Sequence, residues 1–352
     1  MNILSEILQQ ITGPDEAART ACLARWNSLA KPLGSLGLLE SSLARIAAVT
    51  GSPDLSLERR TLLVLCADNG VVAQGVTQCG SSVTAAVARA LGAGESTVCR
   101  MARAARCRVI PVDLGISDFP PTSGVRNCRV RNGTADITQG PAMTRQECLH
   151  AIALGAELVR ECRTAGVSIL ATGEMGIGNT TTSSAVAAVL LEKSPAEVTG
   201  RGAGLSDAGL ARKITAIERA IGLNRPDPAD PVGVLAKVGG LDLAGLCGVF
   251  LGGALYRIPV LIDGFISGAA ALCAVRLCPR AEFAMLASHV SAEPAGGLML
   301  DALGLKPLIS AGMRLGEGTG AVAALPLLDL ALAVYGSGQT FDHLGIDAYT
   351  PQ

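Results

Sequence analysis

Short apolar runs alternate with longer amphipathic segments along most of the chain from about residue 60 onward. Five of these runs have the length and unbroken apolar character of buried strands, at residues 61–67, 108–112, 167–172, 258–262 and 283–287. The segments between and after them predict helices, among them 82–92, 95–105, 144–164, 182–191, 242–256, 293–303 and 318–335. Strands that alternate with helices are typical of a mostly parallel sheet, so the pattern predicts an α/β fold.

The first 50 residues show helical spacing and no strand pattern. We therefore expect a small helical domain from residues 1–55 together with about 337–352, beside an α/β catalytic domain at 56–336. The prolines and glycines of residues 116–142 predict an irregular or hairpin excursion, and those of 221–232 predict a connector.

Composition narrows the classes of function. The net charge of −1 offers no basic field, so no nucleic-acid partner is expected. No charge-free apolar run is long enough for a membrane span, and the first residues lack a signal-like pattern, so the cytoplasm is the expected compartment. The 11 cysteines form no Cys-x-x-Cys pair and are interpreted as reduced thiols. With only 3 histidines, no metal site and no cofactor are expected.

The stretch from Val167 to Thr182 joins a strand, a glycine loop and the start of a helix. Its loop, Gly173-Glu-Met-Gly-Ile-Gly, holds one carboxylate, Glu174, and Asn179 and Thr180 are expected to cap the helix that follows. Glycines let the backbone approach a ligand, and a helix N-terminus favours anions, so the stretch predicts a phosphate site. The loop lacks the Walker ending, and an ordinary tight turn is the alternative.

Polar residues follow each of the five predicted strands. They are Asp68-Asn69, Asp113, Glu174, Asp263 and the run 288–291. Ligands of open α/β sheets bind outside the carboxyl ends of the strands, so we expect these residues to gather at one edge. Some of these residues, Asp263 among them, could instead only cap the helix that follows. Asp242, at the start of the predicted helix 242–256, is interpreted as the cap of that helix.

A second unusual loop, Gly312-Met-Arg-Leu-Gly-Glu-Gly-Thr-Gly-Ala, precedes the predicted helix at 318–335. Glu317 stands between two glycines there, so no neighbouring side chain shields it from a cleft. A carboxylate favoured by the helix dipole is the alternative interpretation.

Seven motifs occur in an order that resembles nicotinate-nucleotide–dimethylbenzimidazole phosphoribosyltransferases. They are Lys31-Pro-Leu-Gly-Ser-Leu-Gly, Cys66-Ala-Asp-Asn-Gly-Val, Gly173-Glu-Met-Gly-Ile-Gly-Asn-Thr-Thr, Lys237-Val-Gly-Gly, Leu261-Ile-Asp-Gly-Phe, Ser288-His-Val-Ser-Ala-Glu and Met313-Arg-Leu-Gly-Glu-Gly-Thr-Gly-Ala. The resemblance implies a doubly wound, Rossmann-like parallel sheet flanked by helices. It also implies transfer of ribosyl phosphate from nicotinate mononucleotide to a benzimidazole-type base, and a homodimer whose partner contributes to the cleft; a heterodimer with a close relative is the alternative.

The resemblance also implies roles for individual residues. Glu317 takes the proton of the base, Glu174 is a second carboxylate of the catalytic cleft, and Asp263 falls in the same cleft. Nicotinate is bound by Ser291 and the backbone near Gly320. The phosphate group is bound by Gly176, Gly178, Asn179, Thr180 and Lys213. On spacing alone, Lys213 reads equally as a solvated lysine of a helix.

The base pocket implied by the resemblance departs from the usual family pattern. Cys79 and Val87 stand where relatives carry Ser and Gln, Met175 replaces a usual Leu, and Leu315 belongs to the same pocket. Because apolar side chains replace hydrogen-bonding ones, we expect a looser preference that extends to phenolic or substituted bases.

Two other functions compete with this interpretation. A non-catalytic nucleotide-binding subunit would be free to lose Glu317, which the chain retains in its full loop. An NAD-dependent oxidoreductase is disfavoured, because no strand is followed by a complete Gly-x-Gly-x-x-Gly with an acidic residue about 20 positions later.

Overall fold

Six parallel strands form the central sheet of the computed structural model, which describes residues 3–349 of the chain. They lie in the order β3-β2-β1-β4-β5-β6, so the chain winds outward in both directions from β1, as in doubly wound folds. This order confirms the predicted fold class. The strands are β1 (Arg60–Ala67), β2 (Cys107–Gly115), β3 (Arg126–Asn127), β4 (Ile169–Met175), β5 (Val260–Ile262) and β6 (Met285–Ala287).

β1 shows why the strands read as continuous apolar runs. Its residues are all buried, and Leu62 pairs with Val109 of β2 on one side and Ala171 of β4 on the other. Alternate residues enter different cores: Leu63 contributes to the core on one face and Leu62 to that on the other. A strand with helices on both faces needs apolar side chains at every position.

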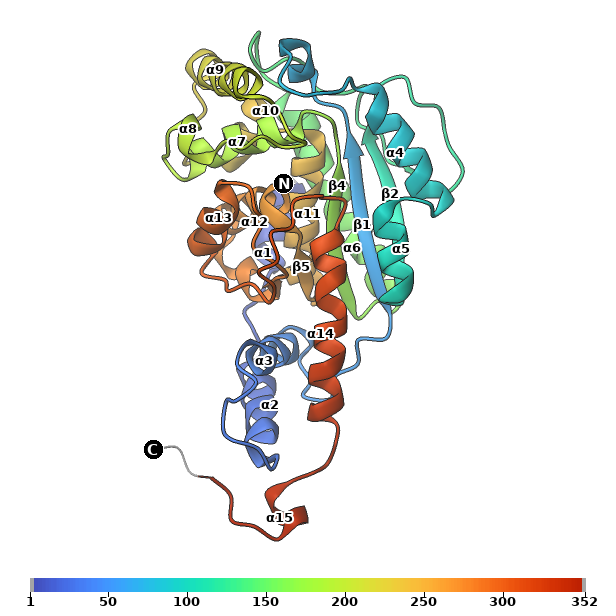
Figure 1. Cartoon of the computed structure of the whole chain (residues 1–352), viewed down its shortest axis with the longest axis vertical. Coiled ribbons are helices and arrows are strands. Elements are labelled where there is room, and N and C mark those ends of the chain that lie inside the picture. Colours follow the sequence, from blue (N-terminus) through green and yellow to red (C-terminus); the bar gives the residue numbers. More distant parts are fainter. Residues whose placement is uncertain (1–2, 350–352) are drawn as a thin grey trace.

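Helices cover both faces of the sheet (Figure 1). One face is covered by α6 (Arg145–Thr164), α11 (Leu241–Tyr256) and α12 (Gly264–Leu277), and the other by α4 (Ser82–Ala93), α5 (Thr97–Ala104) and α14 (Thr319–Tyr335). α6 and α11 pack so closely that a Cβ on Gly155 would collide with the α11 backbone. The other elements of the α/β part are α1 (Ile3–Gln10), η1 (Gly70–Gln74), α7 (Asn179–Leu190), α8 (Pro195–Val198), α9 (Asp207–Asn224), α10 (Pro231–Val238), η2 (Pro279–Ala284) and α13 (Ala295–Leu303).

A smaller helical part projects from the sheet (Figure 1). It contains α2 (Glu16–Ser28), α3 (Leu38–Thr50) and α15 (Phe341–Leu344), and the long helix α14 connects it to the α/β part. Trp26 packs against Tyr335 with ring centroids 5.1 Å apart and the ring planes tilted by 53°, and Leu29 forms an antiparallel bridge with Thr340. The division into two domains stays a prediction; α1 packs on α6 and α11 rather than on α2. Residues 1–2 and 350–352 of the predicted small domain lie outside the described residues.

The local predictions had different outcomes. The 116–142 segment is irregular, as one of the two predicted alternatives stated, and contains no hairpin among its described residues; it also adds β3, parallel to β2, whose two exposed residues carry no apolar pattern. The 221–232 connector is partly helical, because α9 continues to Asn224 and α10 starts at Pro231, whose fixed φ suits a first helical position. Asp242 is not the cap of α11: Gly240 holds that position, and Asp242 lies buried in the first turn. No helix within residues 3–349 has the length and apolarity needed to cross a membrane.

Candidate active site

A cavity of about 270 Å³ lies where the loops after β4, β5 and β6 converge, at the carboxyl end of the sheet. Most of the predicted site residues line it: Cys79, Glu174, Met175, Gly176, Gly178, Asn179, Thr180, Asp263, Ser291, Leu315 and Glu317. Lys213, Val87 and Gly320 do not line it, and neither do the strand-end residues Asp68, Asn69 and Asp113. The loop that joins β4 to α7 supplies the longest continuous part of its wall.

The start of α7 leaves backbone amides free beside the cavity. Gly178 is the N-cap, with φ at 93° and no side-chain cap. Within residues 3–349, the amide groups of Gly178 and Thr180 have no hydrogen-bond partner. The expectation that Asn179 and Thr180 cap this helix was wrong, because both lie within its first turn. Asn179 instead donates its side-chain amide to Glu174 and, at 3.2 Å, to Asp242.

Lys213 lies behind the cavity wall rather than in it. Its ammonium is fully buried and donates to the Thr180 hydroxyl at 2.9 Å and to the Gly200 carbonyl at 3.1 Å. Gly202 lies beside both Thr180 and this ammonium. Burial lowers the pKa of Lys213 to about 8, and the negative charge of Glu293 acts in the opposite direction. A solvated surface lysine, the alternative interpretation, is therefore wrong.

Glu174 is a carboxyl group that changes its charge near neutral pH. Burial, followed by the negative charge of Asp242, raises its pKa to about 8, against the hydrogen bond from Asn179. Burial also raises the pKa of Asp242 to about 6. The sequence analysis missed the contribution of Asp242; the signal was a single charge within the small, apolar run 241–254.

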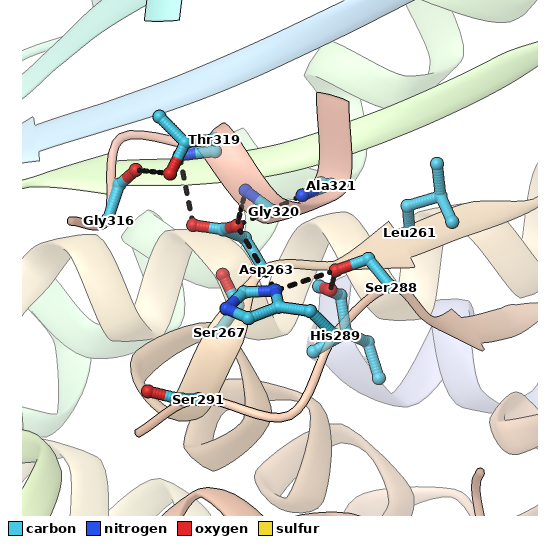
Figure 2. A network of polar contacts seen from close by, with 12 residues as sticks. Leu261, Asp263, Ser267, Ser288, His289, Ser291, Gly316, Thr319, Gly320 and Ala321 are labelled. Carbon is cyan, nitrogen blue, oxygen red and sulfur yellow. Dashed lines mark hydrogen bonds and ion pairs between the residues drawn. The ribbon is translucent and has the colours of Figure 1, made fainter. Parts of the chain in front are cut away.

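Asp263 holds the N-cap position of α12, but its side chain caps a different helix (Figure 2). Its carboxylate accepts hydrogen bonds from Gly318, Gly320 and Ala321 at the start of α14, at 2.9, 2.8 and 3.0 Å. The suggestion that it caps the segment from Phe265 onward therefore holds for its position and not for its carboxylate. His289 lies beside it, with Nδ1 3.9 Å from Oδ1. Burial raises the pKa of Asp263, while His289 and the three amides oppose this.

The backbone near Gly320, which the family resemblance implies as a binding site for nicotinate, already donates its hydrogen bonds within the protein. The Gly320 amide donates to Asp263, and the Thr319 amide donates to the Gly316 carbonyl at 3.0 Å. Ser291, in contrast, lines the cavity, and its hydroxyl accepts a hydrogen bond from the Glu293 amide at 3.3 Å.

Glu317 lines the cavity in a backbone conformation that is rare for a residue with a side chain. Its φ is +58°, between Gly316 at +84° and Gly318 at +89°. Its Oε2 atom is buried and has no hydrogen-bond partner in the described part of the chain. Burial raises its pKa, although Val98 and Ser96 at the start of α5 lower it. Glu174 lies close to the loop of Glu317: the Oε1 atom of Glu174 is 2.7 Å from the position that a Cβ on Gly316 would take.

Four further charged or titratable side chains line the cavity without an assigned role in the sequence analysis. They are Arg201, His289, Glu293 and Arg314. His289, Glu293 and Arg314 lie within motifs that carry the family resemblance, and Arg201 lies between Gly200 and Gly202; these positions were the available signal. Within residues 3–349, no three His, Cys, Asp or Glu side chains are grouped as ligands of a metal ion.

Three of the four residues predicted for the base pocket lie together in the cavity. Cys79, Met175 and Leu315 line the cavity, and Leu315 is 54% exposed. Val87 lies on α4, partly buried against the core on that face of the sheet. A preference set by apolar side chains therefore rests on three residues rather than four.

Comparison with known proteins gives a consistent result. A family model described as "Phosphoribosyltransferase" matches residues 11–346. The chain is 46% identical over 328 residues to nicotinate-nucleotide–dimethylbenzimidazole phosphoribosyltransferase of Acetivibrio thermocellus, covering 93% of each chain. It is 42% identical to the protein of that name from Clostridium acetobutylicum, covering 100% of this chain and 99% of the relative. The crystal structure of CobT from Thermus thermophilus is similar, with a TM-score of 0.89, 38% identity, and 95% and 100% of the two chains covered.

Proposed function

This chain belongs to the nicotinate-nucleotide–dimethylbenzimidazole phosphoribosyltransferase family, and we propose how its cavity performs the reaction. The enzyme moves the ribosyl phosphate group of nicotinate mononucleotide to 5,6-dimethylbenzimidazole, the lower-ligand base of cobalamin. A nitrogen of the base bonds to C1′ of the ribose as the bond from C1′ to the pyridinium nitrogen breaks. The bonding electrons return to that ring, nicotinate leaves, and inversion gives α-ribazole 5′-phosphate.

The phosphate group binds at the start of α7. The amides of Gly178 and Thr180 adjoin a cavity and have no partner in the described part of the chain, and the helix dipole adds partial positive charge there. Gly176 and Asn179 complete this turn, and Lys213 supplies a full positive charge from behind Thr180. Ser291 binds the carboxylate of nicotinate. The Gly320 amide contributes only if it leaves Asp263, so Ser291 is the stronger candidate.

The base loses its second proton to a carboxylate. An azole that gains a bond at one nitrogen becomes cationic unless the other nitrogen is deprotonated, and a carboxylate in reach accepts that proton. Glu317 is the proposed acceptor, with Glu174 as the second catalytic carboxylate beside it. The observation that carries the proposal is this pair: the buried carboxyl group of Glu174 and the half-buried one of Glu317, both with raised pKa values, line the cavity beside the start of α7.

Nicotinate release tests the proposal directly. The purified protein is incubated with nicotinate mononucleotide and 5,6-dimethylbenzimidazole, and both products are followed by chromatography. The expected result is base-dependent release of nicotinate together with α-ribazole 5′-phosphate, and its loss in Glu317→Ala. Tight binding of nicotinate mononucleotide without any turnover would instead indicate the non-catalytic nucleotide-binding subunit.

The preference among bases follows from the apolar lining. Cys79 and Met175 place weak hydrogen-bonding groups in the cavity, so we propose that phenolic and substituted benzimidazole bases are accepted beside dimethylbenzimidazole. Turnover with 5,6-dimethylbenzimidazole, adenine and p-cresol measures this preference. Exclusive use of adenine would contradict it.

A homodimer in the cytoplasm is the proposed state of the enzyme. Large apolar side chains are exposed on the second half of α14 and on the segment after it: Leu330, Val334, Leu344, Ile346 and Tyr349. A second copy of the chain would cover this face. Light scattering after size-exclusion chromatography measures the mass; a monomer of the purified chain would favour the heterodimer with a close relative.

A further inference from the structure

We propose that Glu293 is a positioning residue of the phosphate site. Its carboxylate and the Lys213 ammonium both contact Gly200, and together they set how tightly the enzyme holds the phosphate group of nicotinate mononucleotide as the solution becomes alkaline. This inference rests on the function proposed above and extends it to a residue outside the reacting atoms.

The side chain of Glu293 lies against Gly200. It lies in the loop between β6 and α13, lines the cavity, and is followed by Pro294. Its Oε2 atom is buried, has no hydrogen-bond partner within the described residues, and occupies the space that a Cβ on Gly200 would need. A buried carboxylate oxygen without a donor is costly unless a nearby positive charge offsets it.

Lys213 supplies that positive charge from the other side of Gly200. Its side chain is fully buried, and it uses two of its three ammonium protons on Thr180 and the Gly200 carbonyl. A buried ammonium needs a counter-charge, and the Thr180 hydroxyl and the Gly200 carbonyl are both neutral. Within the described residues, Gly200 therefore lies beside a carboxylate oxygen that has no donor and an ammonium that has no charged acceptor.

The other elements packed against α9 offer Lys213 no free anion. Within the described residues, α7 and η1 contain no charged side chain. The nearby charged groups have partners of their own: Glu197 with Lys193 and Ser194, Lys237 with the Arg225 carbonyl, Arg201 with Asp207, Arg212 with the Gly75 carbonyl, and His289 with Asp263. Glu293 remains as the counter-charge.

The sign of the pH effect follows from this pairing. Burial lowers the pKa of Lys213 to about 8, and Glu293 limits that decrease. The amine is thus mostly charged at neutral pH and loses its charge as the pH rises through 8. Without the carboxylate, that loss comes at lower pH, and attraction for a phosphate dianion falls with it.

The test is the dissociation constant of nicotinate mononucleotide, measured by calorimetry across the alkaline range for the wild type and Glu293→Gln. At about pH 8.5 we expect the variant to bind about tenfold more weakly, with a much smaller difference at about pH 6.5. Nicotinate riboside, which lacks the phosphate group, is the control ligand and should bind both proteins alike. Glu293→Asp keeps the charge and should restore most of the wild-type profile.

A merely structural role for Glu293 gives different results. It would weaken riboside and mononucleotide equally, at every pH, and Glu293→Asp would not rescue binding; either result overturns the inference. In a Lys213→Met background, Glu293→Gln should have no further pH-dependent effect, and an additive effect would also overturn it. Failure of the wild type to bind mononucleotide at any pH would defeat the proposed function as well, whereas an unchanged profile in Glu293→Gln defeats this inference alone.

Discussion

The helices α7 and α14 begin at similar glycine N-caps and use them differently. In each, a Gly-x-Gly loop leads to a glycine N-cap with positive φ, 93° at Gly178 and 89° at Gly318. In each, the next amide donates to the first glycine of the loop, Asn179 to Gly176 and Thr319 to Gly316, both at 3.0 Å.

The amides that remain have different partners. At α14, the carboxylate of Asp263 accepts hydrogen bonds from the amides of Gly318, Gly320 and Ala321. At α7, the amides of Gly178 and Thr180, which hold the equivalent places, have no partner within residues 3–349. A glycine N-cap is therefore an internal structural joint where the residue after a neighbouring strand supplies an anion. Where none is supplied, it remains open to an anionic ligand.

Among the tests of this comparison, removal of the Asp263 carboxylate should have the largest effect on stability and activity. Asp263→Ala leaves three buried amides at the start of α14 without an acceptor, so we expect the free energy of unfolding to fall by about 3 kcal/mol. We also expect a large loss of kcat, because the loop that holds Glu317 is no longer anchored. Denaturant unfolding and steady-state kinetics measure the two effects.

Asp263→Asn is the matched control, because it keeps the shape and one acceptor oxygen. It should lose less stability than the alanine variant. Equal stability of the wild type and Asp263→Ala would show that the two helix starts do not differ in the way described.

At the open turn, a mutation should weaken ligand binding rather than stability. Thr180→Val removes the hydroxyl that holds Lys213, so we expect KM for nicotinate mononucleotide to rise about tenfold with a small change in kcat. Inorganic phosphate should raise the Tm of the wild type and have a weaker effect on this variant. A fall in kcat with unchanged KM would instead place Thr180 in the chemical step.

Glu174 touches both loops and should show a smaller, pH-dependent effect. Because its pKa is about 8 in the folded protein, the native state retains a proton that the unfolded chain loses at lower pH. Stability therefore falls as the pH rises from the unfolded value toward 8, since the unfolded state then binds fewer protons.

Glu174→Gln removes that dependence. At about pH 8 we expect it to be more stable than the wild type by about 1 kcal/mol while losing activity, which is a stability–activity trade-off. Thermal unfolding at several pH values measures the difference. Parallel stability profiles for the two proteins would contradict the raised pKa of Glu174.

The sequence predicted the architecture better than the connections within the site. Apolar runs flanked by helices indicated five of the six strands, and their polar ends led to Glu174 and Asp263. The helix that Asp263 caps could not be predicted, because its partners at 318–321 are distant in sequence and become neighbours only in the folded sheet. The role of Asp242 was misjudged for the same reason, and the burial of Lys213 could not be predicted: their partners Asn179 and Gly200 are not connected to them by local patterns.

The bridge between Leu29 and Thr340 has a consequence for biogenesis. The Ala30 amide also donates to the Gln339 carbonyl, and Trp26 packs against Tyr335, so one side of the α2–α3 pair is completed only by a much later part of the chain. On the ribosome, α2 and α3 can pack on each other early, but the side of Trp26 that faces Tyr335 stays uncovered until almost all the rest has been translated. The α/β sheet can assemble during synthesis, whereas this junction closes only afterwards, and a chaperone would find its binding site there.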